Sequence, residues 1–354
     1  MNHTERKKSK KNTWLITISI LILTLSLLYI FGPKPPKPEF SSLVIPAYHS
    51  DLQMLEDSLN NSESSLRLKP DNEARIVWAR PFTKTEYSII YLHGNGASQE
   101  EGDPVHEALA HRYGCNLFLS RLADHGMLSE DPMIDIDANE WMQSALDALA
   151  LGHRLGEKVI ILSTSSGSTL SLYLAAYYPD LVDGLIMMSP NVDIYDSRSF
   201  ILTEPFGLQI ARKIAGSEFY GWKAPGPAQK YWYTRYRIEG LCTLKSMINC
   251  TMTEETFSQV KAPVLMLYYY KDENNQDDVV SVKRMKEMYD QLGTAPRLKR
   301  EFALADANTH IIGSDIFNHN LHSVWDPVVE FCEEVLDLTP VNDTDWKPFL
   351  DNRQ

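Results

Sequence analysis

The sequence predicts an α/β fold: a mostly parallel β-sheet flanked by helices, with a helical insertion and an N-terminal transmembrane helix. Three observations carry this prediction. Apolar strand-like runs alternate with helix-length stretches along most of the chain, the alternation breaks once between residues 191 and 260, and one long uncharged run lies near the N-terminus. The 354 residues suffice for a large domain with a sizeable core.

The strand candidates are short apolar runs bounded by polar residues. Several are continuous Val, Ile, Leu and Tyr rather than alternating patterns, as expected for strands that are buried on both faces. They are Ala74–Arg80, Tyr87–His93, Cys115–Arg121, Lys158–Ser163, Gly184–Ser189, Val264–Tyr270 and Leu298–Ala305. Helices are expected at Asp51–Asn60, Pro104–Tyr113, Ala138–Leu155, Ser168–Tyr178, Asp278–Leu292 and Val324–Leu338. This alternation predicts parallel strands joined by helical crossovers.

The stretch from about Asn191 to Val260 breaks the alternation. It contains no strand candidate, many aromatic residues and the kinking segment Ala224–Pro227. We therefore expect an inserted unit of about 70 residues that is mainly helical. Its aromatic residues suggest binding of an apolar group, although aromatics in a small helical unit more often form its core.

An uncharged and mostly apolar run extends from Trp14 to Phe31, and at 1.5 Å per residue a helix of that length spans about 27 Å. A cleaved signal peptide is the alternative, but its apolar region is shorter, and here a stiff Pro-rich segment follows instead of a cleavage site. Residues 1–12 carry a balance of +4. The positive-inside bias then places this tail in the cytoplasm and the main body outside.

The predicted organisation is a basic cytoplasmic tail (residues 1–12), a membrane anchor (13–31), a Pro-rich linker (32–40) and a main α/β domain (41–354). The total charge of −13 less the +4 of the tail leaves −17 on the remainder, which argues against a nucleic-acid partner. Four scattered cysteines are too few for a disulfide framework or a zinc site, although Cys242 and Cys250 are close enough in sequence to pair.

The strongest local signal is a buried strand that runs into a cluster of small residues, Ser163-Thr164-Ser165-Ser166-Gly167, followed directly by a helix. A nucleophile on such a sharp turn requires small residues two positions before and two after it. Ser165 has Ser163 and Gly167 there, whereas Ser163 would have the bulky Ile161. Ser165 is therefore the candidate nucleophile and Ser166 a distant second.

Three further signals follow strand ends. His93-Gly94-Asn95-Gly96 suits backbone amides that approach a developing oxyanion. Asp272 follows one strand candidate and could orient a histidine, and His310 follows the last strand candidate and suits a general base. Each signal alone is weak. Their order along the chain is that of serine hydrolases built on open α/β sheets, which place their sites at the carboxyl ends of strands.

From about Ala74 to Leu338 the chain resembles the α/β-hydrolase superfamily, nearest to the bacterial carboxylesterase and monoacylglycerol-lipase-like branch. The resemblance implies the α/β-hydrolase fold with a lid insertion at about 191–260. It assigns Ser165 as elbow nucleophile, Asp272 as acid and His310 as base, with the amides of Asn95 and Ser166 as the oxyanion hole. The segment Arg121–Gly126 resembles the Gly-His-Gly loop of that branch.

Three other carboxylates and two rival functions accompany this assignment. Asp193 also follows a strand end, and Asp277 and Asp278 lie further along the acidic loop, where helix capping is the simpler role. The expected activity is hydrolysis of carboxylic esters with apolar acyl groups, small molecules or lipids, without metal or cofactor. The alternatives are a thioesterase, amidase or peptidase with the same triad, and a membrane-tethered binding protein that has lost catalysis.

Overall fold

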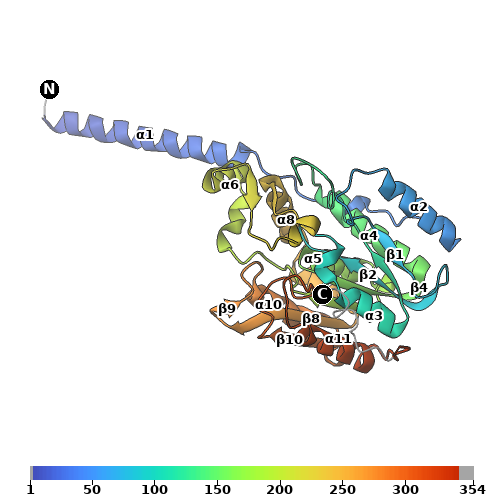
Figure 1. Ribbon diagram of the computed structural model, residues 1–354. Helices are drawn as coiled ribbons and strands as arrows, with labels where there is room; N and C mark the ends of the chain where they lie inside the picture. Colours follow the sequence, from blue (N-terminus) through green and yellow to red (C-terminus); the bar gives the residue numbers. More distant parts are fainter. Residues whose placement is uncertain (1–2, 343–354) are drawn as a thin grey trace.

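The computed structural model describes residues 3–342, and one eight-stranded sheet forms the centre of the protein (Figure 1). Its order is β1-β3-β2-β4-β5-β8-β10, and the short strand β9 pairs with β8. β1 and β9 run antiparallel to their neighbours, and the other pairs are parallel. The strands are β1 (Arg75–Val77), β2 (Thr85–Leu92), β3 (Asn116–Leu119), β4 (Gly156–Thr164), β5 (Gly184–Met188), β8 (Val264–Asp272), β9 (Asn275–Gln276) and β10 (Lys299–Leu304). The predicted parallel sheet is confirmed.

Helices cover both faces of this sheet. On one face α3 (Val105–Tyr113) and α11 (His322–Glu334) pack against the sheet, and on the other lie α2 (Leu52–Ser64), α4 (Ala138–Leu155), α5 (Ser166–Tyr177) and α10 (Val282–Gln291). Alternate residues of β4 belong to the two layers: Ile161 packs into the first core cluster and Leu162 into the second. This two-sided burial explains the continuous apolar runs of the central strands.

The inserted unit lies between β5 and β8 and is mainly helical, as expected. It consists of the 3₁₀ segment Ser197–Thr203 and the helices α6 (Gly207–Ala215), α7 (Ala228–Tyr231), α8 (Ile238–Thr251) and α9 (Glu254–Gln259). The expectation that it contains no strand is wrong, because β6 (Phe219–Gly221) and β7 (Arg235–Arg237) form a small antiparallel ribbon. Three residues a side are too short to leave a clear alternating pattern in the sequence.

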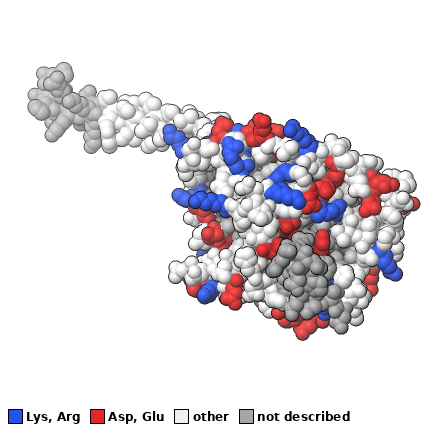
Figure 2. Space-filling model, in the orientation of Figure 1, with Lys and Arg blue, Asp and Glu red and all other residues white. Residues whose placement is uncertain are grey.

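The N-terminal helix α1 (His3–Phe31) projects away from the body, with α6 beside its inner end (Figure 1). Its segment Asn12–Phe31 is long and apolar enough to cross a membrane, and none of it is buried against the protein. Figure 2 shows uncharged surface along the part of α1 next to the body, whereas acidic and basic residues are intermixed over the body itself.

The inner end of α1 contacts the inserted unit. The Tyr29 hydroxyl donates a hydrogen bond of 2.7 Å to the Glu204 carboxylate, and the Phe206 amide donates one of 2.8 Å to the Pro33 carbonyl. Gly32 packs so tightly here that a Cβ would lie 2.6 Å from the Phe206 ring. The apolar helix and the insertion therefore meet directly at the start of the linker.

Candidate active site

The nucleophile candidate occupies a strained turn between β4 and α5. Ser165 follows the last residue of β4 directly, and α5 begins at Ser166. Ser165 has φ 53° and ψ −121°, a backbone conformation that L-residues rarely adopt and that persists only where the surroundings enforce it. Such a turn lifts the side chain away from both the strand and the helix. Ser165 itself is 5% exposed.

Small residues on both sides make this turn possible. A Cβ on Gly167 would lie 2.0 Å from the Leu92 carbonyl oxygen, so position 167 accepts glycine alone. Ser163 stands where glycine is usual in such turns, and it is fully buried. Its hydroxyl is hydrogen-bonded to those of Ser168 (3.0 Å) and Ser171 (3.1 Å), which satisfies the additional polar atom.

The loop after β2 lies beside this turn. A Cβ on Gly94 would lie 2.9 Å from the Cβ of Ser165, so the loop and the nucleophile are in contact. Gly96 has a positive φ of 71°, which favours glycine, and its carbonyl accepts a 2.7 Å hydrogen bond from the Tyr233 amide of the insertion. Ser166 is the first residue of α5, so its N–H has no carbonyl one turn earlier to bond.

Ser165 and His310 are each hydrogen-bonded to one of two consecutive residues at the end of β5. The Ser165 amide donates to the Met188 carbonyl (3.0 Å), and the Ser189 hydroxyl donates to the His310 carbonyl (2.7 Å). The two residues, 145 positions apart in sequence, therefore meet at the same sheet edge. No hydrogen bond joins their side chains among the described residues, and such bonds commonly tighten only when a substrate is bound.

Asp277, not Asp272, contacts the histidine. The Nδ1 atom of His310 is 2.6 Å from an Asp277 carboxylate oxygen, and Asp277 is 1% exposed. The other carboxylate oxygen accepts the amides of Val279 and Val280 at 2.9 and 3.0 Å. With Nδ1 donating to Asp277, the Nε2 atom of His310 carries the lone pair that a general base needs.

The assignment of Asp272 from the sequence is corrected by the path of β8. This strand does not end at Tyr270 but continues to Asp272 and turns into β9, so Asp272 lies exposed in a hairpin. There its carboxylate accepts the amides of Asn274 and Asn275 at 2.9 and 3.0 Å. The return strand brings Asp277 back to the sheet, where its amide donates to the Tyr269 carbonyl (3.1 Å).

Asp193, the rival from the preceding strand, has a different partner. Its carboxylate pairs with the Lys245 ammonium of α8 at 2.5 Å and accepts the amide of Ile194 at 2.8 Å. Lys245 is buried, so this ion pair ties the insertion to the end of β5. Asp193 therefore fastens the insertion to the core and does not contact His310.

The carboxylates around His310 favour its protonated form. Burial opposes the charge, but the charge and hydrogen bond of Asp277, with smaller effects of Glu101 and Asp278, raise the pKa of His310 above its ordinary value. A histidine of this kind is a stronger base toward a neighbouring hydroxyl, since the imidazolium formed by proton transfer is stabilised.

Glu101 is a buried carboxylate at this site that the sequence reading missed. It lies in the 3₁₀ segment Gln99–Gly102, is 3% exposed, and accepts the Gly94 amide at 2.5 Å. Burial raises the pKa of Glu101 to about 7, against the opposing effects of the Gly94 amide, His310 and Trp232. Two consecutive glutamates before a helix read as solvated residues, so no sequence signal singled out this one.

The loop Arg121–Gly126 packs against His93, the residue directly before Gly94 of the oxyanion loop. The Leu122 amide donates to Nε2 of His93 (3.1 Å), and the His125 ring lies 4.9 Å from that of His93. Asp124, in place of the first glycine of the resembling loop, has a positive φ of 58°. Burial raises the pKa of the Asp124 carboxyl to about 6. This loop therefore supports the residues that precede the oxyanion loop.

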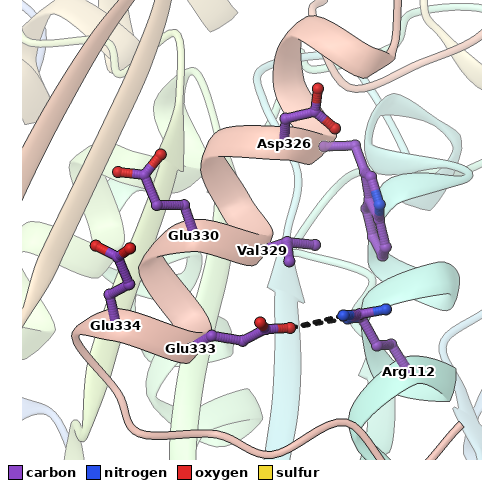
Figure 3. Close-up of a pocket in the computed structure, with 7 residues that line it drawn as sticks. Arg112, Asp326, Val329, Glu330, Glu333 and Glu334 are labelled. Carbon is purple, nitrogen blue, oxygen red and sulfur yellow. Dashed lines mark hydrogen bonds and ion pairs between the residues drawn. The ribbon is translucent and has the colours of Figure 1, made fainter. Parts of the chain in front are cut away.

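Two other features lie apart from Ser165. Ligand atoms of Asp103, His106 and Glu107 come within 4.8 Å of one another at the start of α3, a spacing that would suit a metal ion. A cavity of about 390 Å³ between α11 and the end of α3 is shown in Figure 3, where Glu333 points to Arg112. The four cysteines are free.

The cavity is lined by Arg112, Trp325, Asp326, Val329, Glu330, Glu333 and Glu334. Four of these side chains are carboxylates and only Arg112 is basic, so the cavity offers little to an apolar acyl group. It is therefore not the site at which Ser165 would meet an ester.

No family model matches the chain. A thermostable monoacylglycerol lipase from Bacillus sp. (strain H-257) is 29% identical over 106 residues, which is 30% of this chain. The match spans 41% of the length of that relative.

Solved structures extend the similarity over most of the chain. A structure from a study of two metagenome-derived lipolytic enzymes, LipS and LipT, has a TM-score of 0.60 at 15% identity and covers 75% of this chain and 98% of its own. Est1E from Butyrivibrio proteoclasticus with bound ferulic acid has a TM-score of 0.52 at 16% identity, covering 75% and 95%. An enol-lactonase from Burkholderia xenovorans LB400 has a TM-score of 0.50 at 14% identity, covering 74% and 96%.

Proposed function

The chain has the α/β-hydrolase fold and resembles lipases and esterases of that superfamily, and on this basis we propose that it is a serine hydrolase of carboxylic esters. Ser165 is the nucleophile, His310 the general base and Asp277 the carboxylate that orients and charges the histidine. The observation that carries the proposal is the strained serine at the β4–α5 turn, at the same sheet edge as a buried His310–Asp277 pair.

The reaction proceeds in two steps. His310 takes the Ser165 proton through Nε2 while the serine oxygen attacks the ester carbonyl, and the amides of Asn95 and Ser166 hold the oxyanion. The protonated His310 then gives its proton to the leaving alcohol, which departs and leaves an acyl group on the serine. A water that His310 deprotonates cleaves this acyl-enzyme and restores the free serine.

An apolar acyl or alcohol group suits this site best. The insertion presents Trp232 next to Ala97 of the oxyanion loop and Ile311 beside the histidine, in one apolar cluster. The curated relative named above is a monoacylglycerol lipase, which supports substrates with one fatty acyl chain. Short p-nitrophenyl esters and monoacylglycerols are therefore the first substrates to compare.

A fluorophosphonate probe, which reacts only with an activated serine, tests the nucleophile. We expect the purified full-length protein to be labelled, and Ser165→Ala to lose both the label and p-nitrophenyl ester turnover. Ser166→Ala is the matched control, because it removes the neighbouring hydroxyl and keeps the backbone amide. Labelling of Ser165→Ala, or its loss only in Ser166→Ala, would refute Ser165 as nucleophile.

We further propose that α1 anchors the protein in a membrane with the catalytic body outside the cytoplasm. The apolar segment Asn12–Phe31 and the basic residues before it support this topology. Added protease should then digest the body on spheroplasts without lysis, while a cytoplasmic marker protein stays intact. Protection of the body until the membrane is dissolved would contradict this orientation.

A further inference from the structure

Glu101 is buried against the candidate oxyanion loop without a role in the reaction above. Its carboxylate oxygen accepts the Gly94 amide, the peptide immediately before Asn95. Its own amide donates to the Ser98 carbonyl (3.2 Å) in the 3₁₀ turn, so the backbone that carries it is ordered. The glutamate therefore closes the loop 94–101 from inside the protein.

Gly94 lies next to both this carboxylate and the nucleophile. A Cβ at position 94 would lie 2.9 Å from both carboxylate oxygens of Glu101 and 2.9 Å from the Cβ of Ser165. The carboxylate and the serine side chain thus both border the space that a Cβ at position 94 would fill. Any movement of Glu101 would be transmitted to the peptide that presents the Asn95 amide.

Charged and titratable groups surround this carboxylate on several elements. His310, from the loop after β10, partly opposes the burial that raises the pKa of Glu101, and burial together with the smaller effect of Glu101 raises the pKa of Tyr91 on β2. Asp103 and Glu100 of the same segment also act on Tyr91. His310 itself is faced by Asp277 and Asp278 in addition to Glu101. Glu101 is therefore a second carboxylate that acts on the catalytic histidine.

We propose that Glu101 is a positioning residue of the hydrolytic site: by accepting the Gly94 amide it holds the start of the oxyanion loop, and with it the following Asn95 amide, in place for the oxyanion. This inference rests on the proposed function. Electrostatically, an ionised Glu101 supports the imidazolium that forms when Ser165 loses its proton. Geometrically, the accepted Gly94 amide fixes the direction of the next amide, that of Asn95, which must point at the oxyanion.

Two substitutions separate these effects. Glu101→Gln keeps an oxygen that accepts the Gly94 amide but removes the charge, and Glu101→Ala removes both. Glu100→Gln is the matched control, because it removes the adjacent charge from the same turn. For the full-length protein in detergent, kcat and KM for a p-nitrophenyl ester are measured between pH 5 and 9, together with thermal unfolding and fluorophosphonate labelling.

The expected results differ between the variants. In Glu101→Gln the acidic limb of kcat/KM shifts to lower pH by about half a unit or more, since His310 loses a stabilising charge, and kcat on the plateau stays within about threefold. In Glu101→Ala the limb shifts likewise, and kcat falls by about tenfold or more with little change in KM. In Glu100→Gln the limb stays in place, because Asp277, Glu101 and Asp278 are the carboxylates that raise the pKa of His310.

The inference is overturned if the acidic limb of the kcat/KM profile is unchanged in Glu101→Gln, or if kcat is unchanged in Glu101→Ala. A purely structural role for Glu101 would lower thermal stability in both variants without moving the limb. If Glu101→Ala does not fold, the limb of Glu101→Gln still decides. If Ser165→Ala still turns over the ester, the proposed function is refuted, and this inference with it. If Ser165→Ala is inactive but the Glu101 variants behave as the wild type, only this inference is refuted.

Discussion

Exchange of the Asp277 carboxylate for an amide is the most decisive perturbation of the candidate triad. Asp277→Asn keeps the shape of the side chain and removes the charge 2.6 Å from Nδ1 of His310. The amide can also present its NH₂ group to Nδ1, which would favour the wrong tautomer and place the proton on Nε2. Both effects act on the base and leave the serine and the oxyanion loop in place.

The magnitude follows from the burial of the pair. With charge centres about 4 Å apart and an effective dielectric constant of about 20, the interaction between Asp277 and the imidazolium is about 4 kcal/mol. At 1.36 kcal/mol for each factor of ten, this corresponds to a loss of about 10³ in rate. The loss of the correct tautomer adds to this, so we expect kcat/KM to fall by about 10³ to 10⁴.

Asp272→Asn is the matched control, since it makes the same chemical change five residues earlier in the chain. Asp272 is exposed in the β8–β9 hairpin and holds only the local turn, so its kcat/KM is expected to stay within about twofold of wild type. Initial rates with a p-nitrophenyl ester, normalised to the fraction of folded protein, compare the two variants. A large loss in Asp272→Asn together with near-normal rates in Asp277→Asn would refute the assignment.

Four further predictions follow from the same geometry. Because the pKa of His310 is raised and the base must be neutral, kcat/KM should rise with pH through a midpoint above about 6.5, measured as a pH–rate profile; a midpoint below that value contradicts the electrostatics. Gly167→Ala should unfold at markedly lower temperature or fail to fold, because its Cβ meets a carbonyl oxygen at 2.0 Å; an unchanged melting temperature would contradict this contact. Ser163→Gly should retain turnover and lose about 1 kcal/mol of unfolding free energy in urea titrations, because it removes two hydroxyl contacts; inactivation would mean that the hydroxyl has a further role. Asp193→Asn should lower that free energy by about 1–3 kcal/mol with kcat nearly unchanged, since it leaves the buried Lys245 without its charged partner; a loss of kcat at full stability would restore Asp193 as a triad candidate.

The parts of the site that a short contiguous pattern encodes could be predicted from the sequence. A buried strand, a cluster of small residues and an immediate helix place Ser165 on its turn, because few other backbones can join a strand to a helix within one residue. The strand candidates were likewise readable, since parallel strands that are buried on both faces have continuous apolar runs. The backbone of these elements follows from local composition, and the structure confirms them.

The substitution of Ser163 for glycine shows why a motif can be relaxed without losing its geometry. From the sequence, a serine at this position puts the turn in doubt. In the structure the hydroxyl finds two serine partners one and two turns along α5, at positions 168 and 171. Compensation of this kind depends on residues that are distant from the motif window, and so it becomes visible only in three dimensions.

The carboxylate partner of His310 could not be predicted, because its position depends on where a strand ends. The run through Tyr270 predicts a strand end next to Asp272, but pairing with β9 extends the strand and carries Asp272 past the sheet edge. A hairpin shifts the returning residue by an amount set by backbone pairing rather than by side-chain type. Asp277 was read as a helix cap for the same reason: the sequence contains no sign that its carboxylate lies opposite His310.

Glu101 is a second residue that the sequence does not identify, and its effect on the site is electrostatic as well as geometric. Polar residues in a short turn between a strand and a helix are usually solvated, and nothing in the sequence distinguishes Glu101 from Glu100. Its burial arises because the turn folds inward under the insertion, where Trp232 packs on Ala97. A carboxylate costs free energy in such a place unless it is paired, so its retention beside Gly94 and His310 requires compensating contacts of the kind found there. Loops that join the core strands thus determine the electrostatics of the site, while the strands determine only where it lies.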